Sequence, residues 1–259
     1  MSEEVLYQVN DGVARITFNR PEARNAFTFA MYARLAEICK NASADPAVKV
    51  LLFSGVDETA FAAGTDISEF RKWSGAQDAL DYEVRINTLL DGLERVPKPT
   101  IAAIAGACTG GGSTIAACCD IRIGAANARF GVPIARTLGN CLSMANYVRL
   151  VALLGQSRVK DILFTGRLVE ADEARSIGLL SEVLPDFATL QTRADELART
   201  IASRAPLTLR VTKEALRLIK EKMTPEEDAS MILTCYLSND FQEGMDAFLN
   251  KRKPKWTGT

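Results

Sequence analysis

Two short glycine-containing segments carry the residue types that point most directly to chemistry: "AAGTD" at Ala62–Asp66 and "TGGG" at Thr109–Gly112. Each follows a predicted buried strand and precedes a predicted helix. A glycine lets the backbone approach a ligand closely, and the first N–H groups of a helix have no partner within it. Two converging N–H groups would form an oxyanion hole for a carbonyl gaining negative charge, where one donor is worth ~3–4 kcal/mol. The alternative is that Gly110–Gly112 only allow a tight turn and close packing of a helix on a strand.

The segment around these glycines is poor in acids and bases. The chain has no histidine, and between residues 100 and 160 its only acidic residue is Asp120. Neither loop has the glycine order of a nucleotide-phosphate loop. The stretch "IARTLGNCLSMANY" offers Arg136, Asn140 and Cys141. Arg136 is either an anion-binding group or a surface cation, Asn140 is a candidate hydrogen-bonding partner for a substrate tail, and Cys141 is either a nucleophile or a packed thiol.

Composition argues against several classes of protein. The 259 residues are 47% hydrophobic and 24% charged, with a net charge of −1, so no overall basic field would attract nucleic acid or an anionic membrane. The six cysteines form no C-x-x-C pair, and we expect no metal site. No stretch approaches the ~18 consecutive apolar residues of a membrane span. The N-terminal "MSEEVLYQV" lacks a signal pattern, so we expect a cytoplasmic protein that binds neither nucleic acid nor membrane.

Hydrophobic periodicity predicts strands that alternate with helices. The stretch "LYQVNDGVARITFNR" alternates around Asp11-Gly12, which predicts a hairpin. Continuous apolar runs in "VKVLLFSG", "TIAAIAG" and "DIRIGA" indicate buried strands. Helical spacing predicts helices in "FTFAMYARLAEICKNA", with Thr28 as N-cap, and in "ALDYEVRINTLLDGLERV". The pattern beyond residue 190 is nearly all helical. The fold class predicted from these elements is α/β.

Five segments resemble the enoyl-CoA hydratase/isomerase family, also called the crotonase superfamily, in order and spacing over nearly the whole chain. They are "ARITFNRPEARNAF", "AFAAGTDISEF", "KPTIAAIAGACTGGGSTIAACCDIRIGAANARFGVP", "LFTGRLVEADEARSIGLLSEVL" and "FQEGMDAFLNKRKPKW". One segment alone, such as the glycine triplet, would not be specific. The five together are.

This resemblance implies a crotonase-type spiral of ββα units at residues 1–200 and a helical oligomerisation region at residues 201–259. Members of the family bind acyl-CoA thioesters and assemble as homotrimers or dimers of trimers. Coenzyme A enters as part of the substrate, and no cofactor is bound permanently. The thioester carbonyl lies between two backbone N–H groups that stabilise an enolate. Matched by position, those donors are the N–H groups of Thr65 and Gly111.

The resemblance also implies two sets of contacts with the coenzyme A part of the substrate. One set surrounds the first glycine loop, and the other lies in the C-terminal tail, from which it would reach the coenzyme A of a neighbouring subunit. A lysine near a phosphate is physically sensible, although a basic run such as "NKRKPK" is usually just a solvated end of the chain. The matching positions in this chain are Arg24, Ala26, Ala62, Ala63, Asp66 and Ile67 in the first set, and Phe248 and Lys251 in the tail.

The chain departs from the family at both acid–base positions. Hydratases of the family hold and split a water with two glutamates, and the corresponding residues here are Thr114 and Ile134. Hydration requires a base for the water and an acid for the α-carbon, and each such group typically contributes ~10²–10⁴-fold to the rate. We therefore do not expect efficient hydration. Asp120, in "CCDIRI", is expected to be structural.

Three hypotheses about function remain open. The chain is an acyl-CoA enzyme with non-standard catalytic residues, for which Glu69, Asp81 or Glu83 would supply a carboxylate from another part of the fold. Alternatively, it decarboxylates a malonyl-type acyl-CoA, because loss of CO₂ generates the enolate directly and Arg136 is available for the carboxylate. The third hypothesis is an acyl-CoA-binding protein without catalysis. An RNA-binding role is disfavoured by the net charge of −1.

Overall fold

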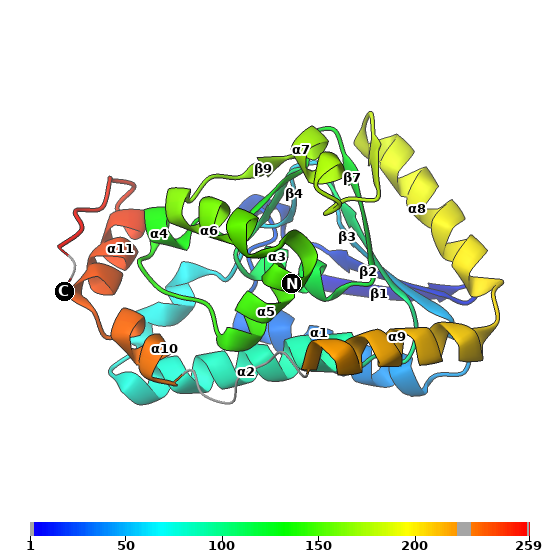
Figure 1. The fold of residues 1–259 in the computed structure, drawn as a ribbon, viewed down its shortest axis with the longest axis horizontal. Coiled ribbons are helices and arrows are strands. Elements are labelled where there is room, and N and C mark those ends of the chain that lie inside the picture. Colours follow the sequence, from blue (N-terminus) through cyan, green and yellow to red (C-terminus); the bar gives the residue numbers. More distant parts are fainter. Residues whose placement is uncertain (1–2, 222–228, 258) are drawn as a thin grey trace.

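The backbone of the core is a six-stranded sheet crossed by helices on both faces (Figure 1). The computed structural model describes residues 3–221, 229–257 and 259, without the side chains of Lys72 and residues 229–232. The strand order is β1-β2-β3-β5-β7-β10, with β1 antiparallel to β2 and the other pairs parallel. The strands are β1 (Val5–Asn10), β2 (Val13–Phe18), β3 (Val50–Gly55), β5 (Thr100–Ile104), β7 (Ile121–Ala125) and β10 (Glu182–Leu184).

The structure confirms the predicted hairpin at the start of the chain. Asn10 pairs with Val13, and the two residues between them, Asp11 and Gly12, have φ angles of 50° and 81°. Two consecutive positive φ angles match the twist of the flanking strands, which is why Asp-Gly is favoured here. The hairpin forms one edge of the sheet, and β2 carries the pairing on to β3.

A second sheet, made of short strands, lies beside the first. It has the order β4-β6-β8-β9, from β4 (Ala60–Ala62), β6 (Ala107–Thr109), β8 (Arg129–Gly131) and β9 (Val169–Glu170). Each of β3, β5 and β7 is followed directly by one of these strands and then by a helix. This is the expected spiral of ββα units. The short strands were not predicted from the sequence, because two or three residues are too few to show a periodicity.

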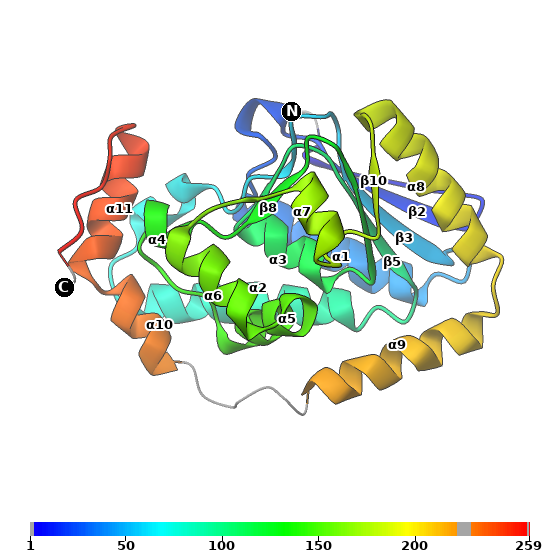
Figure 2. The ribbon, with the colours of Figure 1, turned by 45° about the horizontal axis from the view of Figure 1, so that its top comes forward.

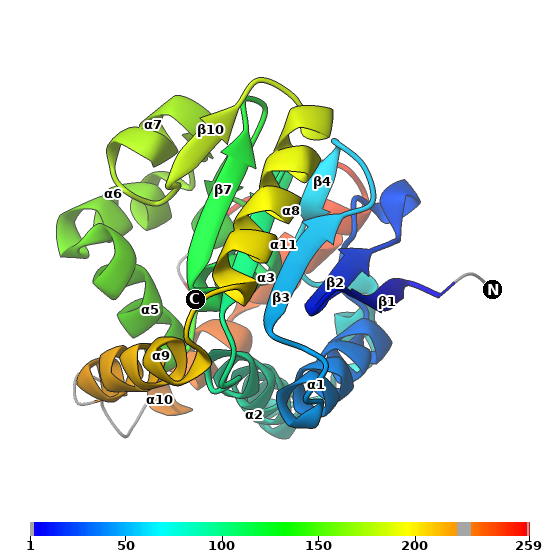
Figure 3. The same ribbon diagram turned by 90° about the vertical axis from the view of Figure 1, so that its right-hand side faces the viewer.

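Helices cover the two faces of the large sheet unequally. On one face lie α1 (Phe29–Ala44), α2 (Ala76–Glu94) and α3 (Gly111–Cys118), packed over alternate strand residues such as Leu51 and Phe53. The other face is covered by α8 (Phe187–Ala202), which packs on Val50 and Leu52 (Figure 3). The central strands are therefore apolar on both faces, as the continuous runs predicted. Thr28 caps α1 by accepting a hydrogen bond from the Met31 N–H, also as predicted.

The remaining helices lie either between β8 and β10 in the chain or in the C-terminal tail. After α4 (Ile134–Thr137), the helices α5 (Met144–Leu154), α6 (Gln156–Thr165) and α7 (Ala171–Ser176) lead to β10. The tail consists of α9 (Pro206–Glu221), α10 (Ala229–Tyr236) and α11 (Asn239–Leu249) (Figure 2). Helix α10 packs on α2, and α11 packs on α4. In the part of the chain that the structure describes, no helix is long and apolar enough to cross a membrane.

Helix α9 is attached to the core by charges, whereas its apolar side chains face outward. Lys213 Nζ lies 2.8 Å from a carboxylate oxygen of Asp120, and Lys220 pairs with Glu94. Asp120 also accepts a hydrogen bond of 2.8 Å from the Thr100 N–H, so its role in this fold is structural, as expected. None of the residues of α9 is buried, and its exposed apolar side chains are Leu207, Val211, Leu216, Leu218 and Ile219.

The glycine triplet is required by close approach as well as by backbone conformation. Gly110 has a φ of 52°, in the left-handed region that favours glycine. At Gly112, an added Cβ would lie 2.2 Å from the carbonyl oxygen of Ala62. Helix α3 thus packs directly on the backbone of β4. The two alternatives from the sequence are compatible, because the same close packing brings the two glycine loops together.

Substitutions at two glycines should have opposite effects on stability. We expect Gly112→Ala to lower the free energy of unfolding by at least the ~1–3 kcal/mol typical of overpacking, because a backbone carbonyl blocks the new methyl. Gly92→Ala is the control: it lies within α2, and an added Cβ would meet no atom within 4 Å. Because alanine is the better helix former, this variant should be about 1 kcal/mol more stable than wild type. Urea unfolding measures both, and equal destabilisation would contradict the packing argument.

Candidate active site

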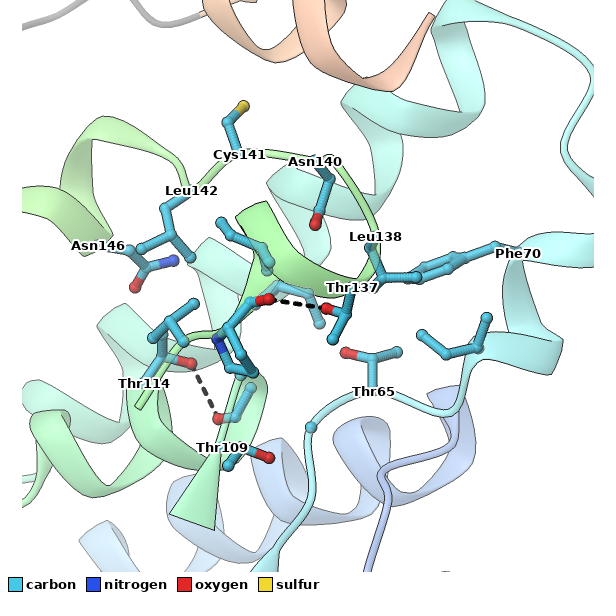
Figure 4. Close-up of a pocket in the computed structure, with 18 of the residues that line it drawn as sticks. Thr65, Phe70, Thr109, Thr114, Thr137, Leu138, Asn140, Cys141, Leu142 and Asn146 are labelled. Carbon is cyan, nitrogen blue, oxygen red and sulfur yellow. Dashed lines mark hydrogen bonds between the residues drawn. The ribbon is translucent and has the colours of Figure 1, made fainter. Parts of the chain in front are cut away.

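A cavity of about 180 Å³ lies where the two glycine loops meet helix α2 and the tail (Figure 4). Its walls come from six parts of the chain: the first loop and η2 (Ile67–Lys72), helix α2, the triplet and α3, the segment from Val132 to Leu142, helix α5, and the tail. The polar residues among those that line it are Thr65, Tyr82, Glu83, Thr109, Thr114, Thr137, Asn140, Asn146 and Tyr236. The described lining contains neither lysine nor arginine.

Backbone pairing with Phe27 fixes the direction of the Thr65 N–H. The Phe27 N–H donates to the Gly64 carbonyl at 2.7 Å, and the Asp66 N–H donates to the Phe27 carbonyl at 2.9 Å. Because peptide groups alternate along an extended chain, the N–H of Thr65 faces away from Phe27. Both Thr65 and Gly111 line the cavity.

The N–H of Gly111 opens onto the same space. Gly111 is the first residue of α3, after Gly110 as N-cap, so its N–H has no acceptor within the helix. An added Cβ at Gly64 would lie 3.7 Å from the Gly111 nitrogen, which shows how closely the loops approach. The partial positive charge of the helix N-terminus adds to this effect. Thr65 and Gly111 thus bring two backbone N–H groups to the lining of one cavity.

Two tyrosine hydroxyls hold the side chain of Thr65 by hydrogen bonds. The Thr65 hydroxyl lies 2.8 Å from the Tyr32 hydroxyl and 2.8 Å from the Tyr82 hydroxyl. Burial raises the pKa of Tyr32 and of Tyr82, and the nearby charge of Glu83 adds to the increase in both. Both phenols therefore stay neutral at physiological pH and act only as hydrogen-bonding groups. Sequence analysis missed them, because neither position differs in pattern from an ordinary core tyrosine.

The two positions of the absent glutamates both line the cavity. Thr114 is buried, with 4% of its surface exposed, and its hydroxyl donates to the Gly111 carbonyl at 2.9 Å. Ile134 opens α4 and is partly buried. Neither side chain can exchange a proton near neutral pH. These walls of the cavity can therefore shape and position a substrate, but they cannot transfer a proton.

Glu83 brings a carboxylate into the cavity from α2. It is only 5% exposed, and among the described lining residues it is the one acidic group. The Tyr236 hydroxyl donates to Glu83 Oε1 at 2.7 Å, and Asn140 Nδ2 donates to the Tyr236 hydroxyl at 3.1 Å. Burial, together with the charge of Glu83, raises the pKa of Tyr236 well above its usual value. The buried carboxylate is thus held by a residue of the tail.

The helical spacing of α2 contained the signal that distinguishes Glu83 from its neighbours. Glu83 shares the buried face of the helix with Ala79, Ile86 and Leu90, at intervals of three and four residues. Asp81 is exposed and does not line the cavity. Glu69 accepts a hydrogen bond of 3.2 Å from the Phe29 N–H, outside the lining. Of the three carboxylates proposed from the sequence, only Glu83 reaches the cavity.

The segment expected to hold reaction-specific groups contributes unevenly. Asn140 and Cys141 line the cavity, and Asn140 Oδ1 is buried without a hydrogen-bond partner among the described residues. In Figure 4 this oxygen points into the space beside Leu138. Arg136 is exposed and is not among the lining residues, which fits the surface-cation alternative. None of the six cysteines forms a disulfide.

The positions expected to contact coenzyme A lie at and around the rim. Ala63, Ile67 and Phe248 line the cavity, whereas Ala62 is buried in β4. Asp66 caps η2 and bonds Arg20 at 2.8 Å. Arg24 and Lys251 are exposed, and Ala26 is partly buried.

Phe248 lies near the end of α11 in the tail. It lines the cavity of its own chain, where α11 packs on α4, and the expected contact of the tail with a neighbouring subunit stays a prediction. In the part of the chain that the structure describes, no cluster of three or more side chains could hold a metal ion.

Comparison with known proteins agrees with this architecture. The family model described as enoyl-CoA hydratase/isomerase matches residues 8–259. A short-chain-enoyl-CoA hydratase from Clostridium acetobutylicum is 33% identical over 96% of this chain and 95% of its own. An enoyl-CoA hydratase/carnithine racemase from Magnetospirillum magneticum is 33% identical, with a TM-score of 0.81 over 100% of this chain and 97% of that one.

A third protein of the same architecture has a different activity in its name. It is a methylmalonyl-CoA decarboxylase in complex with 2-nitronate-propionyl-CoA, 28% identical, with a TM-score of 0.91 over 100% of both chains. The match of the family model across nearly the whole chain and the fold shared with these structures lead to one conclusion. The chain belongs to the enoyl-CoA hydratase/isomerase family and has the crotonase fold.

Proposed function

We propose that this protein binds an acyl-CoA thioester with the carbonyl oxygen between the N–H groups of Thr65 and Gly111, and stabilises the enolate formed there. The observation that carries the proposal is the approach of the two glycine loops at the wall of one cavity. A single donor of this kind contributes ~3–4 kcal/mol when the charge develops in a buried site. With no lysine or arginine in the described lining, these backbone groups supply the positive potential.

Coenzyme A enters this proposal as part of the substrate and not as a resident cofactor. The rim residues Ala63 and Ile67 contact its thioester end, Arg24 and Ala26 lie along its path, and Lys251 supplies charge for a phosphate. Ala62 and Asp66 act through the backbone shape of the first loop. Phe248 closes the cavity from the tail, and its presence in the cavity lining supports this role.

An enolate mimic should bind far more tightly than the corresponding ground-state thioester. We expect 2-nitronate-propionyl-CoA to bind wild-type protein at least about 100-fold more tightly than propionyl-CoA, because only the nitronate carries the charge distribution of the intermediate. Isothermal titration calorimetry measures both affinities. Equal affinities would show that the cavity binds thioesters without stabilising an enolate, which is the non-catalytic alternative.

Hydration of crotonyl-CoA should be slow in wild type and faster when the missing acids are introduced. Thr114 and Ile134 both line the cavity, so Thr114→Glu with Ile134→Glu would place two carboxylates where hydratases of the family hold water. Each group typically contributes ~10²–10⁴-fold, and we expect at least a 100-fold gain in the double variant. Loss of the enoyl-thioester absorbance measures the rate. A wild-type rate already equal to that of a proficient hydratase would contradict this prediction.

We propose further that the protein assembles as a homotrimer or as a dimer of trimers through the uncovered face of α9. Helix α9 has no buried residue and exposes several apolar side chains to solvent. Such exposure is unfavourable in water and is typical of a surface that binds another chain. Contact with other copies of the chain would bury Leu207, Val211 and Leu216. The mass of the native protein, measured by sedimentation equilibrium, tests the assembly.

Decarboxylation of a malonyl-type acyl-CoA is the second candidate, favoured by the likeness to methylmalonyl-CoA decarboxylase over the full length of both chains. Loss of CO₂ forms the enolate without a base, so the absence of acids at Thr114 and Ile134 does not oppose it. Release of ¹⁴CO₂ from carboxyl-labelled methylmalonyl-CoA and malonyl-CoA measures it. This candidate requires release well above the uncatalysed background, and release at background level would remove it.

A further inference from the structure

We propose that Glu83, positioned by Tyr236, is the catalytic acid–base of this cavity, and that of the two reactions in the family's name it serves double-bond migration, in short β,γ-unsaturated acyl-CoA thioesters. This inference rests on the proposed function, because it requires the thioester carbonyl to lie at Thr65 and Gly111. It assigns proton transfer to Glu83 of α2, which Tyr236 of the tail positions, and not to residues 114 and 134.

The first argument is the location of the carboxylate. Glu83 lines the same cavity as Thr65, Gly111 and Thr114, and it is 5% exposed. Its charge raises the pKa of Tyr32 and Tyr82, the two phenols that bond the Thr65 hydroxyl. The carboxylate is therefore close to the groups that form the floor of the oxyanion site.

The second argument is the environment of Glu83. A buried carboxylate is costly unless it is paired with a cation or well hydrogen-bonded, and the described lining contains no cation. The Tyr236 hydroxyl donates to its Oε1, while Asn140 Nδ2 donates to the phenol oxygen. This chain of donors orients the carboxylate without neutralising it. Ionisable groups kept buried in a cleft in this way are candidates for proton transfer.

The chemical step balances with Glu83 alone. The Glu83 carboxylate takes a proton from the α-carbon of a 3-enoyl thioester, and the C–H electron pair forms the new Cα=C bond of a dienolate. The carbonyl π electrons move to the thioester oxygen, which accepts hydrogen bonds from the N–H groups of Thr65 and Gly111. The electrons then return, the double bond shifts to the α,β position, and the Glu83 carboxylic acid gives its proton to the γ-carbon.

This reaction class fits the cavity better than hydration does. Migration of a double bond needs one group that takes and returns a proton, whereas hydration also needs a group that activates water. The described lining offers one carboxylate, and Thr114 and Ile134 offer none. The volume of about 180 Å³ is below the ~300–1,000 Å³ typical of pockets for drug-sized ligands, so the acyl chain is short.

The test is the conversion of 3-butenoyl-CoA to crotonyl-CoA, followed by the growth of conjugated enoyl-thioester absorbance. Glu83→Gln should lower kcat by at least about 100-fold. Asp81→Asn is the matched control, because it removes an exposed carboxylate from the same helix and should keep wild-type kcat. Glu83→Asp, which keeps the charge, should retain more activity than Glu83→Gln.

The role of Tyr236 has its own readout. Tyr236→Phe removes the donor to Glu83 but leaves the ring in place, so we expect kcat to fall about 10-fold or more with KM nearly unchanged. A purely structural role would instead lower the thermal stability or raise KM. If Tyr236→Phe keeps wild-type kcat, Tyr236 does not position the base.

Binding of 2-nitronate-propionyl-CoA separates this inference from the function on which it rests. Tight binding to wild type and to Glu83→Gln, with isomerisation lost only in the variant, supports both and shows that the variant is folded. Tight binding with no isomerisation by wild type, or with equal rates in wild type and Glu83→Gln, overturns the role of Glu83 and leaves the proposed function intact. Failure of wild type to prefer the nitronate overturns the proposed function and this inference with it.

Discussion

The contact of helix α3 with the backbone of β4 is the constraint on which the site depends. Gly112 has no side chain, and the Ala62 carbonyl occupies the position that a Cβ would need. Because the helix lies this close to the strand, its N-terminus opens beside the loop that follows β4. The two N–H groups then face one cavity, and Gly110 supplies the left-handed turn that starts the helix. The packing of α3 on β4 and the approach of the two glycine loops are therefore one property of the glycine triplet.

A second constraint is electrostatic. The described lining has one carboxylate and no cation, so its positive potential comes only from backbone dipoles. These dipoles do not titrate, and the raised pKa values of Tyr32 and Tyr82 keep the phenols next to them neutral. The polarity of the site therefore stays fixed over a wide pH range. Glu83 is the one carboxylate among the described lining residues, and it comes from α2.

Local signals in the sequence predicted much of this structure, and the misses have a common cause. The Asp11-Gly12 hairpin, the Thr28 cap and the apolar strands follow from neighbouring residues alone. The short strands β4, β6 and β8 form because distant segments pair, which no window of sequence reveals. The same applies to the cavity: motifs in the sequence indicated Thr65 and Gly111, which both line it, but the bond between Glu83 and Tyr236 joins residues far apart in the chain. Only the helical phase of α2 indicated that Glu83, unlike Asp81, faces inward.

The same carboxylate limits which reactions the cavity can serve. A malonyl-type substrate would bring its own carboxylate into a space that contains Glu83 and no lining cation. Two like charges a few ångströms apart repel strongly in a low dielectric, so the substrate would bind either against this repulsion or with one group protonated. A protonated substrate carboxyl does not lose CO₂ readily, whereas a protonated Glu83 cannot take a proton. Proton abstraction by Glu83 and binding of a malonyl carboxylate beside it therefore require opposite charge states of this residue.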